Sequence, residues 1–513
     1  MALLASSDDQ FKYDFKMSAT VDTVLSEIGG YGRYQIFLLQ LVGFIEFGLS
    51  AFNVMIITFI AGEPTWECAE SSVTCNFSGT IDTTSSDYNK RCEMPRSEWK
   101  FSDTFTSTVT EFELVCSKSF LQNVSSSLFW LGWLMGNLLF GHISDKVGRR
   151  KAIISSVIAC SIFSWAIVWP RYLAVYIACR ILIGITCAGS SMTSFVLLVE
   201  YSGVKHRSWA GSNIWYYGSA CFMFLSLMAY LIREWRDLLL YGACLTIPVI
   251  FTSWFLPESC RYLLVNKRHD EAIKQLKKVA KWNRKTFQEV ELEVPKEVEN
   301  EKSDVRDLFY DRKISMITIA SWISWFCCAL VYYAVTYGSI YLGGNIYLNF
   351  ALVSLASIPS TFTSIICMNK FGRRKSLIYG MIISSIASII AVAIPTDRSN
   401  TGYTIGRIIM AMICKYAILV SFNTVYIYSS ELFPTSVRTI GIGTSSAFAR
   451  IGSFLSLYVV WLIRIHALLP YSIVAVLCAV TGAICFKLLP ETVNKPTPES
   501  MRNFVEMNLK MET

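Results

Sequence analysis

Charged residues are scarce in this sequence of 513 residues. Asp, Glu, Lys and Arg together account for 16% of it, whereas hydrophobic residues account for 53%. The charges lie mostly between apolar runs of about twenty residues, which recur from Tyr34 to Leu489. A bilayer requires this separation, because an unpaired charge in hydrocarbon costs several kcal/mol. The pattern excludes a water-soluble protein and predicts an all-α, polytopic membrane protein.

Histidine is also rare, and the short motifs of enzymes are absent. The four histidines (His142, His206, His269 and His466) are scattered, and neither H-E-x-x-H nor G-x-S-x-G occurs. No G-x-x-x-x-G-K-[ST] phosphate loop occurs, which excludes transport driven by ATP on this chain. We therefore expect no enzyme activity, no metal and no cofactor. Residues 1–30 lack an apolar core, so we also expect no cleavable signal peptide and a first span that acts as the insertion signal.

The formal net charge of +8 arises from basic residues that gather in alternate loops. Under the positive-inside rule, such loops face the cytoplasm. The excess therefore indicates topology and not a nucleic-acid surface, and we expect both termini to be cytoplasmic and membrane lipid to surround the protein. The basic loops lie at 146–151, 205–207, 261–313 and 370–375.

The apolar runs predict twelve membrane helices in two groups of six. A charged, helix-favouring linker at 257–313 separates a first bundle at 34–256 from a second at 314–489, with a cytoplasmic N-terminus at 1–33 and a tail at 490–513. The predicted helices are 34–60, 121–142, 151–169, 172–197, 209–232, 238–256, 314–342, 347–369, 376–395, 404–428, 438–463 and 468–489.

The polar segment 61–120, between the first two helices, is predicted to be extracellular. An oxidising compartment would allow its cysteines to form disulfides, in any of three pairings. Asn76 begins a glycosylation sequon in this segment, whereas the sequon at Asn123 abuts the second helix and lies too close to the bilayer for modification. The four cysteines are Cys68, Cys75, Cys92 and Cys116.

Four sequence signatures occur once in each half of the chain, at nearly the same spacing. They indicate two six-helix repeats in parallel arrangement. The chain resembles the major facilitator superfamily, in which the loop between the second and third helices carries a G-x-x-x-D-x-x-G-R-R/K turn. The paired signatures are GRRK at Gly148 and Gly372, arginines 180 and 407, the segments around Glu200 and Glu431, and LPE at Leu256 and Leu489.

The basic turn "GHISDKVGRRK" at 141–151 predicts a gate. Gly141 and Gly148 would allow close helix approach and chain reversal, and Asp145 could accept bonds from a helix N-terminus or from an arginine of the other signature. We infer a latch that holds the halves closed on the cytoplasmic side, looser in the second copy, which lacks the aspartate. A plain topology anchor is the alternative. The candidate gating residues are Asp145, Arg149, Arg150, Glu200, Arg207, Arg373, Arg374, Glu431 and Arg438.

Five ionisable residues lie deep inside predicted helices, where charge usually has a function. Arg180 and Arg407 are related by the repeat and could be structural. Glu46, Lys415 and Arg450 have no counterpart in the other half, which favours a ligand over scaffold symmetry. A structural pair between Glu46 and one of the two cations is the alternative.

Aromatic residues near the middle of several helices suggest a cavity for bulky organic solutes. Ring faces supply apolar area and can hold cations. Any one ring alone is more readily explained by packing, but together, from different helices, they indicate a central aromatic cavity. They are Trp215, Tyr216, Tyr217, Tyr332, Tyr333, Phe422 and Tyr426.

Four further segments, together with the cysteine-bearing loop, resemble the organic cation, organic anion and carnitine transporter family. The resemblance implies polyspecific transport of amphiphilic organic ions by alternating access, with the solute site between the halves. The segments are "EFELVC" (111–116), "PESCRYLL" (257–264), "WFCCALVYYAV" (325–335) and "SFNTVYIYSSELFPTSVRTIGIG" (421–443).

The resemblance also bears on the charge of the solute. Anion and carnitine members carry a lysine and an arginine at the positions of Lys415 and Arg450, and Asn53, Tyr332, Tyr333, Phe422 and Asn423 also fit their pattern. The sequence departs from that pattern at Ser357 and Thr361, and Glu46 is an additional acid.

We therefore expect a transporter of organic anions or carnitine-like zwitterions, in the plasma membrane. An organic cation transporter of the same family and a transporter-derived solute sensor are the alternatives. Transport would be facilitated diffusion, exchange against another organic ion, or cotransport with sodium or protons.

Overall fold

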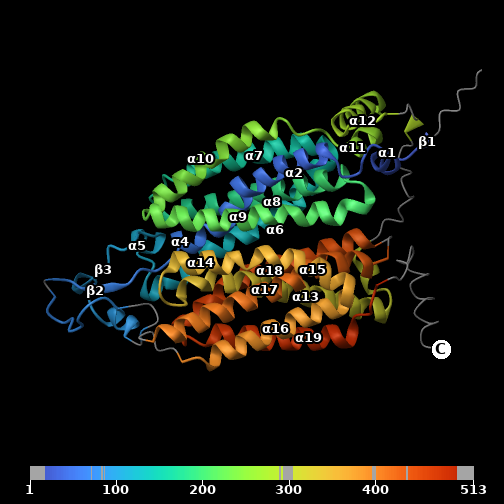
Figure 1. Cartoon of the computed structure of the whole chain (residues 1–513). Helices are drawn as coiled ribbons and strands as arrows, with labels where there is room; N and C mark the ends of the chain where they lie inside the picture. The colour runs from blue at the N-terminus through green and yellow to red at the C-terminus, as the bar shows by residue number, and fades with distance from the viewer. Residues whose placement is uncertain are drawn as a thin grey trace, which may run out of the picture.

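A computed structural model describes residues 18–70, 72–81, 85, 87–287, 291–292, 304–395, 400–434 and 437–493. Most of the predicted N-terminal segment and tail, and part of the predicted linker, lie outside these residues. Helices dominate the rest (Figure 1). The all-α membrane fold predicted from the apolar runs is confirmed.

The first half contains six long helical segments. The first of these runs from Arg33 to Ile60, and a π-helical turn at Glu46–Ala51 interrupts it. The segments are α2 (Arg33–Ile45) continuing into α3 (Phe52–Met55) and α4 (Ile57–Ile60), then α6 (Ser119–Val147), α7 (Arg149–Ala166), α8 (Leu173–Glu200), α9 (Arg207–Leu231) and α10 (Trp235–Ser253).

The second half repeats this arrangement. Its second helix is broken at Ala356, three residues before Pro359, because proline has no N–H to continue the backbone ladder. The segments are α13 (Arg312–Gly338), α14 (Ile346–Leu355) with α15 (Ser357–Phe371), α16 (Arg373–Ala393), α17 (Thr401–Leu432), α18 (Arg438–Trp461) and α19 (Leu469–Leu488).

Among the described residues, eleven helical segments are long and apolar enough to cross a membrane. The remaining predicted span is α7, which has 18 residues and begins with Arg149, Arg150 and Lys151. It packs against α6, α8 and α10 and so belongs to the same bundle. Several helices extend past their predicted ends at the side where the basic turns lie, because polar residues there continue the helix beyond the apolar run.

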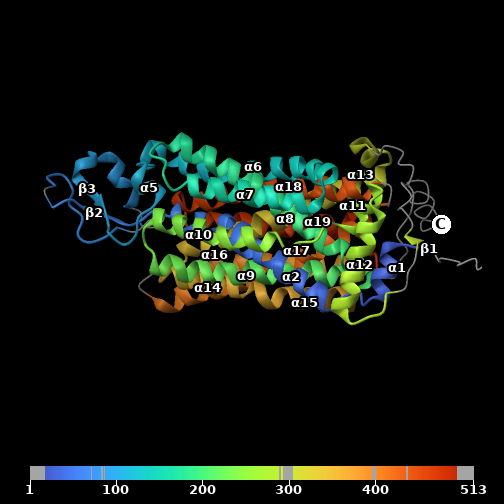
Figure 2. The same cartoon turned by 90° about the horizontal axis from the view of Figure 1, so that it is seen from above.

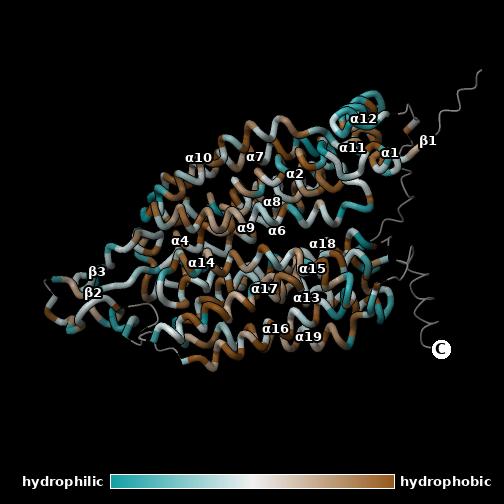
Figure 3. Tube along the Cα trace, viewed as in Figure 1, coloured by the Kyte–Doolittle hydropathy of each residue, from teal (hydrophilic) through white to brown (hydrophobic). Residues whose placement is uncertain are grey.

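The two halves lie side by side along their length (Figures 1 and 2). Apolar residues cover the helices of both halves, and hydrophilic residues gather toward the two ends of the molecule (Figure 3). Within the first half, α6 and α8 make backbone contact. A Cβ added at Gly184 would lie 2.3 Å from the Phe129 carbonyl oxygen, so only glycine permits this approach.

The two ends of the bundle carry different short elements. We call the end with α11 (Cys260–Val265) and α12 (His269–Asn283) the linker end. Here α1 (Val21–Glu27) lies against the bundle, and β1 (Ser18–Ala19) pairs in parallel with β4 (Glu291–Leu292). The linker is therefore partly helical, as its composition predicts.

The opposite end, which we call the loop end, carries the segment between the first two membrane helices. There β2 (Trp66–Cys68) pairs antiparallel with β3 (Trp99–Phe101), and α5 (Thr108–Glu111) leads back to the bundle. Of the three possible pairings, the structure has Cys68–Cys75 and Cys92–Cys116. Asn76 is exposed, and its glycosylation stays a prediction.

A carboxylate supports the first disulfide loop. Oε2 of Glu98 accepts hydrogen bonds from the backbone N–H groups of Val73 and Thr74, at 2.7 and 3.0 Å. These two bonds hold the pKa of Glu98 below its usual value, because they favour the ionised carboxylate. The bond from Thr74 has the larger effect.

Candidate functional site

A buried carboxylate lies at the start of the π-helical turn in the first membrane helix. Glu46 is 8% exposed, and its Oε2 accepts a hydrogen bond from the Ser191 hydroxyl of α8 at 2.9 Å. π-Helical turns inside α-helices are frequent at functional sites. Arg450, on α18 of the second half, lies close enough for its charge to act on Glu46. The two halves therefore present opposite charges to each other.

The guanidinium of Arg450 faces aromatic rings of the first half. Its central carbon lies 5.2 Å from the ring centroid of Trp133 and 5.8 Å from that of Trp130, both on α6. Nε of Arg450 is buried and has no hydrogen-bond partner in the part of the chain that the structure describes. A buried donor without a partner is costly, so this atom is available to an acceptor from a ligand.

Aromatic rings from both halves surround these charges. Trp130 lies 4.5 Å from Tyr333 between centroids, and Trp215 lies 6.2 Å from Tyr426. Phe422 lies 6.0 Å from Tyr332 and 5.5 Å from Tyr426, which joins α13 and α17 in one aromatic cluster. The structure thus brings together predicted residues from α9, α13 and α17.

Sequence reasoning missed three tryptophans of this cluster. Trp130 and Trp133 are three residues apart and so lie on one face of α6, a spacing that could have identified them. Trp325 lies 4.2 Å from Tyr426 between centroids and donates from Nε1 to Ser429 at 2.8 Å. The same spacing relates Trp325 to Trp322 on α13, but Trp322 stacks on Phe448, so the spacing alone did not identify the residue of the cluster.

Lys415 meets this cluster at Tyr332, and its ammonium is already engaged there. Its side chain is 0% exposed, and Nζ donates to the Tyr332 carbonyl at 3.2 Å and to Oγ1 of Thr336. Nζ also lies 3.1 Å from the Tyr332 ring centroid. A buried ammonium needs such partners, and α13 supplies them behind the tyrosine. Lys415 therefore supports Tyr332 in this structure instead of presenting its charge to a solute.

Four other residues predicted to bind the solute make contacts within the protein or lie at the edge of the aromatic cluster. Nδ2 of Asn53 donates to the Leu49 carbonyl of its own helix at 2.8 Å. The Tyr217 ring packs against Gly43 in α2, where an added Cβ would lie 2.5 Å away. Tyr216 is partly buried. Asn423 donates to Oγ1 of Thr361 at 3.5 Å, which links α17 to α15.

The signature residues pair within each half. Nη2 of Arg149 lies 3.0 Å from Asp145 and 3.6 Å from Glu200, all in the first half. In the second half, Nη2 of Arg373 lies 3.0 Å from Glu431. Each arginine thus finds its carboxylate on a helix of its own bundle, and the described residues show no ion pair between the signatures of the two halves. A gating role stays a proposal.

The remaining gating candidates also contact their own half. Arg207 bonds Asp22 at 2.6 Å, and Arg261 bonds the same carboxylate at 2.7 Å. Arg438 donates from Nε to the Phe433 carbonyl at 3.4 Å. Arg150 donates to the Trp254 carbonyl at 2.8 Å, and its counterpart Arg374 donates to the Phe486 carbonyl.

A repeated glutamate caps the helix after each basic turn, and sequence reasoning missed this role. Oε1 of Glu258 accepts from the Arg149 N–H at 2.8 Å, and Oε1 of Glu491 accepts from the Arg373 N–H at 2.9 Å. Both belong to the LPE signature, so the repeat itself carried the signal. Gly148, at φ +102°, allows the reversal.

The expected close approach at Gly141 is wrong for this structure. A Cβ added there would have nothing within 4 Å. The small size of this residue therefore permits no close helix–helix contact here.

The halves contact each other closely at the loop end. The Tyr337 hydroxyl donates to the Val54 carbonyl at 3.3 Å, and the Ser226 hydroxyl donates to the Tyr347 carbonyl at 2.6 Å. The rings of Phe59 and Tyr347 stack at 5.7 Å. The ion pairs described above at the linker end stay within one half. The two halves are therefore in contact with each other at the loop end.

Comparison with known proteins now decides the family. Residues 70–504 match the family described as Sugar (and other) transporter. The organic cation transporter protein of Drosophila melanogaster is 32% identical over 94% of each chain. The chain belongs to the solute carrier 22 family of organic ion transporters, within the major facilitator superfamily.

Other solute carrier 22 proteins match with similar coverage. Organic anion transporter 3 of Oryctolagus cuniculus is 27% identical, and the match covers 94% of this chain and 93% of that protein.

A solved structure shares the fold. The xylose transporter XylE from E. coli, in a partially occluded inward open conformation, matches with a TM-score of 0.64 at 15% identity, over 92% of this chain and 100% of XylE. The solute carrier 22 chain is thus an integral membrane transporter and not an enzyme.

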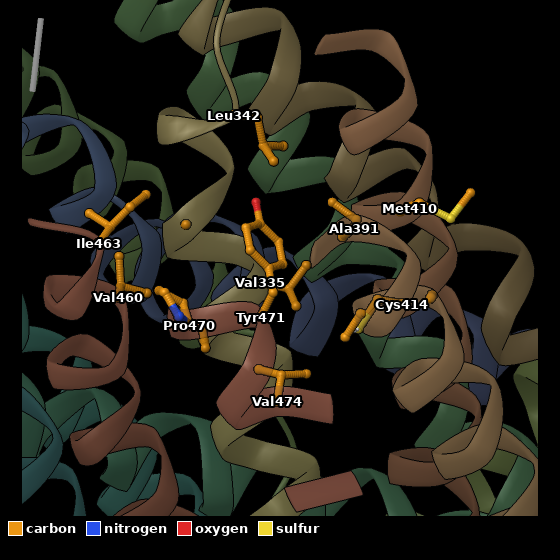
Figure 4. A pocket seen from close by; sticks show the side chains of 15 residues that line it. Val335, Leu342, Ala391, Met410, Cys414, Val460, Ile463, Pro470, Tyr471 and Val474 are labelled. Atoms are coloured by element: carbon orange, nitrogen blue, oxygen red, sulfur yellow. Dashed lines mark hydrogen bonds between the residues drawn. The ribbon is translucent and has the colours of Figure 1, made fainter. Parts of the chain in front are cut away.

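A separate cavity lies within the second half of this solute carrier 22 protein (Figure 4). About 530 Å³ of space, with open solvent at its mouth included, lies between α13, α16, α17 and α19, and the walls are almost entirely apolar. Tyr471, Val335 and Val474 line it, together with Cys414, the neighbour of Lys415. The charged centre at Glu46 and Arg450 lies outside this cavity.

Proposed function

We propose that this transporter carries small organic anions or carnitine-like zwitterions by alternating access. The observation that carries the proposal is the placement of Arg450. Its buried Nε lacks a partner among the described residues, and its guanidinium faces Trp130 and Trp133 across the interface of the halves. A carboxylate is the acceptor that suits a guanidinium best, because it can take two parallel hydrogen bonds.

The surrounding groups suit the rest of such a solute. Its apolar body packs against Tyr333 and Phe422, and the ammonium of a zwitterion lies near Glu46 or over a ring face. Because Lys415 is held behind Tyr332, the charges that the two halves present to each other are the carboxylate of Glu46 and the guanidinium of Arg450. This balance favours a zwitterion or an anion over a simple organic cation, which Arg450 would repel.

The ends of the bundle suggest its orientation. Disulfides form in an oxidising compartment, so the loop end faces outside the cell, in the plasma membrane. The basic turns and both termini then lie in the cytoplasm, in agreement with the positive-inside rule. In this orientation the contacts between Tyr337 and Val54 and between Ser226 and Tyr347 lie on the outer side. Sodium or proton cotransport, or exchange against another organic ion, supplies the driving force.

Uptake of radiolabelled benzoate, carnitine and tetraethylammonium by the full-length chain in proteoliposomes tests the proposal. We expect Arg450→Gln to lower benzoate and carnitine uptake roughly tenfold or more, because it removes a charge-assisted bond to the carboxylate. Glu46→Gln should lower carnitine uptake more than benzoate uptake, since only carnitine carries an ammonium.

Arg171→Gln is the matched control, because Arg171 is an exposed arginine between α7 and α8. It should leave uptake unchanged. Normal benzoate and carnitine uptake by Arg450→Gln would refute the assignment. Saturable uptake of tetraethylammonium alone would favour the organic cation alternative, and binding without uptake would favour a sensor.

A further inference from the structure

A second cavity, with several polar residues in its wall, lies between the halves at the loop end. About 470 Å³ of space, with open solvent at its mouth included, lies between its walls. The first half contributes polar side chains to its wall, and the second half contributes three aromatic residues and an arginine. These lining residues are Thr58, Gln122, Asn123, Tyr337, Tyr341, Trp461 and Arg464.

Arg464 joins the halves at the rim of this cavity. It follows α18, and its Nη2 lies 2.5 Å from Oε2 of Glu63 and 2.8 Å from Oε1 of Gln122, both in the first half. The other carboxylate oxygen of Glu63 bonds Arg91 of the disulfide-bearing segment. The side chains of Glu63 and Arg91 are 1% and 2% exposed, and that of Arg464 is 14% exposed.

This cluster has more positive than negative charge. Two guanidinium groups share the single carboxylate of Glu63, and Nε and Nη1 of Arg91 have no hydrogen-bond partner within the described ranges. Leaving buried charge uncompensated is costly, so the cluster attracts an anion. Of its two arginines, Arg464 is the one that lines the cavity.

Two neutral groups in the cavity wall also lack partners. Oγ1 of Thr58 and Nε1 of Trp461 are buried, and neither has a hydrogen-bond partner among the residues that the structure describes. Thr58 as a whole is buried, and both residues line the cavity. Each is a donor without a partner in a residue of the cavity wall, so a small polar group bound there would satisfy it.

We propose that this cavity is an outer solute site, in which Arg464 binds the carboxylate of an organic anion or zwitterion before the solute reaches Arg450. The carboxylate takes the place of Glu63 and Gln122 on Arg464, and Glu63 keeps its bond to Arg91. Thr58 and Trp461 donate to the polar end of the solute, and Tyr337 packs against its body. This inference rests on the proposed function for the class of solute.

Protection of a cysteine in the cavity tests the site. Ser126 lines the cavity. In the full-length chain in proteoliposomes, with Cys244 and Cys367 changed to serine, Ser126→Cys is labelled from outside with a membrane-impermeant maleimide. Cys244 is the exposed free cysteine and Cys367 is partly buried, so their removal lowers the background. We expect benzoate to slow labelling about fivefold or more and uncharged benzamide to have no effect.

Variants assign the protection to Arg464. Arg464→Gln should remove the effect of benzoate, whereas Lys100→Gln should keep it, because Lys100 forms an exposed pair with Glu67 in the same loop segment. Equal protection in both variants, or none in the unsubstituted chain, would overturn the outer site.

A second measurement needs no added cysteine. Equilibrium binding of radiolabelled benzoate should give two molecules for each wild-type chain, and one for Arg464→Gln and for Arg450→Gln. Arg450→Gln should lose uptake yet keep protection at Ser126→Cys. If the chain takes up benzoate but binds one molecule, and benzoate does not protect Ser126→Cys, the outer site is contradicted and the proposed function stands. Protection without uptake contradicts the proposed function and leaves the outer site standing.

Discussion

At the residue scale, Lys415 and Arg450 have similar sequence signals but different surroundings. Both are cations in the middle of apolar helices without a counterpart in the other half. In the structure Arg450 faces the opposite half, whereas Lys415 bonds Tyr332 and Thr336. Helical spacing could not separate the two, because the difference depends on how α13 packs against α17.

Replacing Lys415 by methionine tests its supporting role. The exchange removes a buried ammonium and keeps an apolar chain of similar length, so we expect little change in thermal stability. Tyr332 loses the cation that lies over its ring, and the KM for benzoate or carnitine should rise up to about tenfold with a smaller change in kcat. Uptake at a series of concentrations, together with thermal unfolding of the purified chain, measures both.

An unchanged KM in Lys415→Met would mean that the lysine only fills space. Complete loss of uptake, equal to that of Arg450→Gln, would mean instead that its charge contacts the solute directly during the cycle. The intermediate effect is therefore specific to a positioning role.

At the element scale, the apolar runs predicted the helices well and their interruptions poorly. Each membrane helix follows from the length and mean hydropathy of its apolar run, and no single residue changes these two quantities much. The π-helical turn at Glu46–Ala51 and the disulfide pairing depend on contacts between distant segments. The break at Ala356 has a local cause in Pro359 that the sequence contained.

The packing of α6 on α8 gives a prediction at this scale. In Gly184→Ala the new methyl group would meet the Phe129 carbonyl and push apart the helix that carries Trp130 and Trp133. Such overpacking costs roughly 1–3 kcal/mol, so we expect a lower midpoint of thermal unfolding and reduced uptake. Thermal unfolding of the detergent-purified chain measures the first effect.

Gly141→Ala is the matched control, although Gly141 belongs to the repeated basic turn. Nothing lies within 4 Å of an added Cβ there, and alanine is the better helix former by about 1 kcal/mol. The midpoint should stay the same or rise. Equal destabilisation by both substitutions would contradict the packing argument.

At the scale of the whole molecule, the arrangement favours two bodies that move against each other. The signature ion pairs hold each half together internally, and the contacts across the loop end are single hydrogen bonds, one buried ion pair and stacked rings. Breaking the second set and keeping the first opens the loop end without unfolding either half. A solute at Arg450 contacts both bodies and can shift their balance.

The distance between the halves at the loop end tests this account most directly. Leu231 at the end of α9 and Leu348 at the start of α14 are exposed and lie one in each half. Spin labels at these two positions, in the full-length chain with Cys244 and Cys367 changed to serine, report the separation by pulsed electron paramagnetic resonance. We predict that saturating carnitine or benzoate changes the population of the longer distance, and that Arg450→Gln abolishes this response. A distance distribution that ignores the solute, or that responds equally in Arg450→Gln, would contradict a solute site between two moving halves.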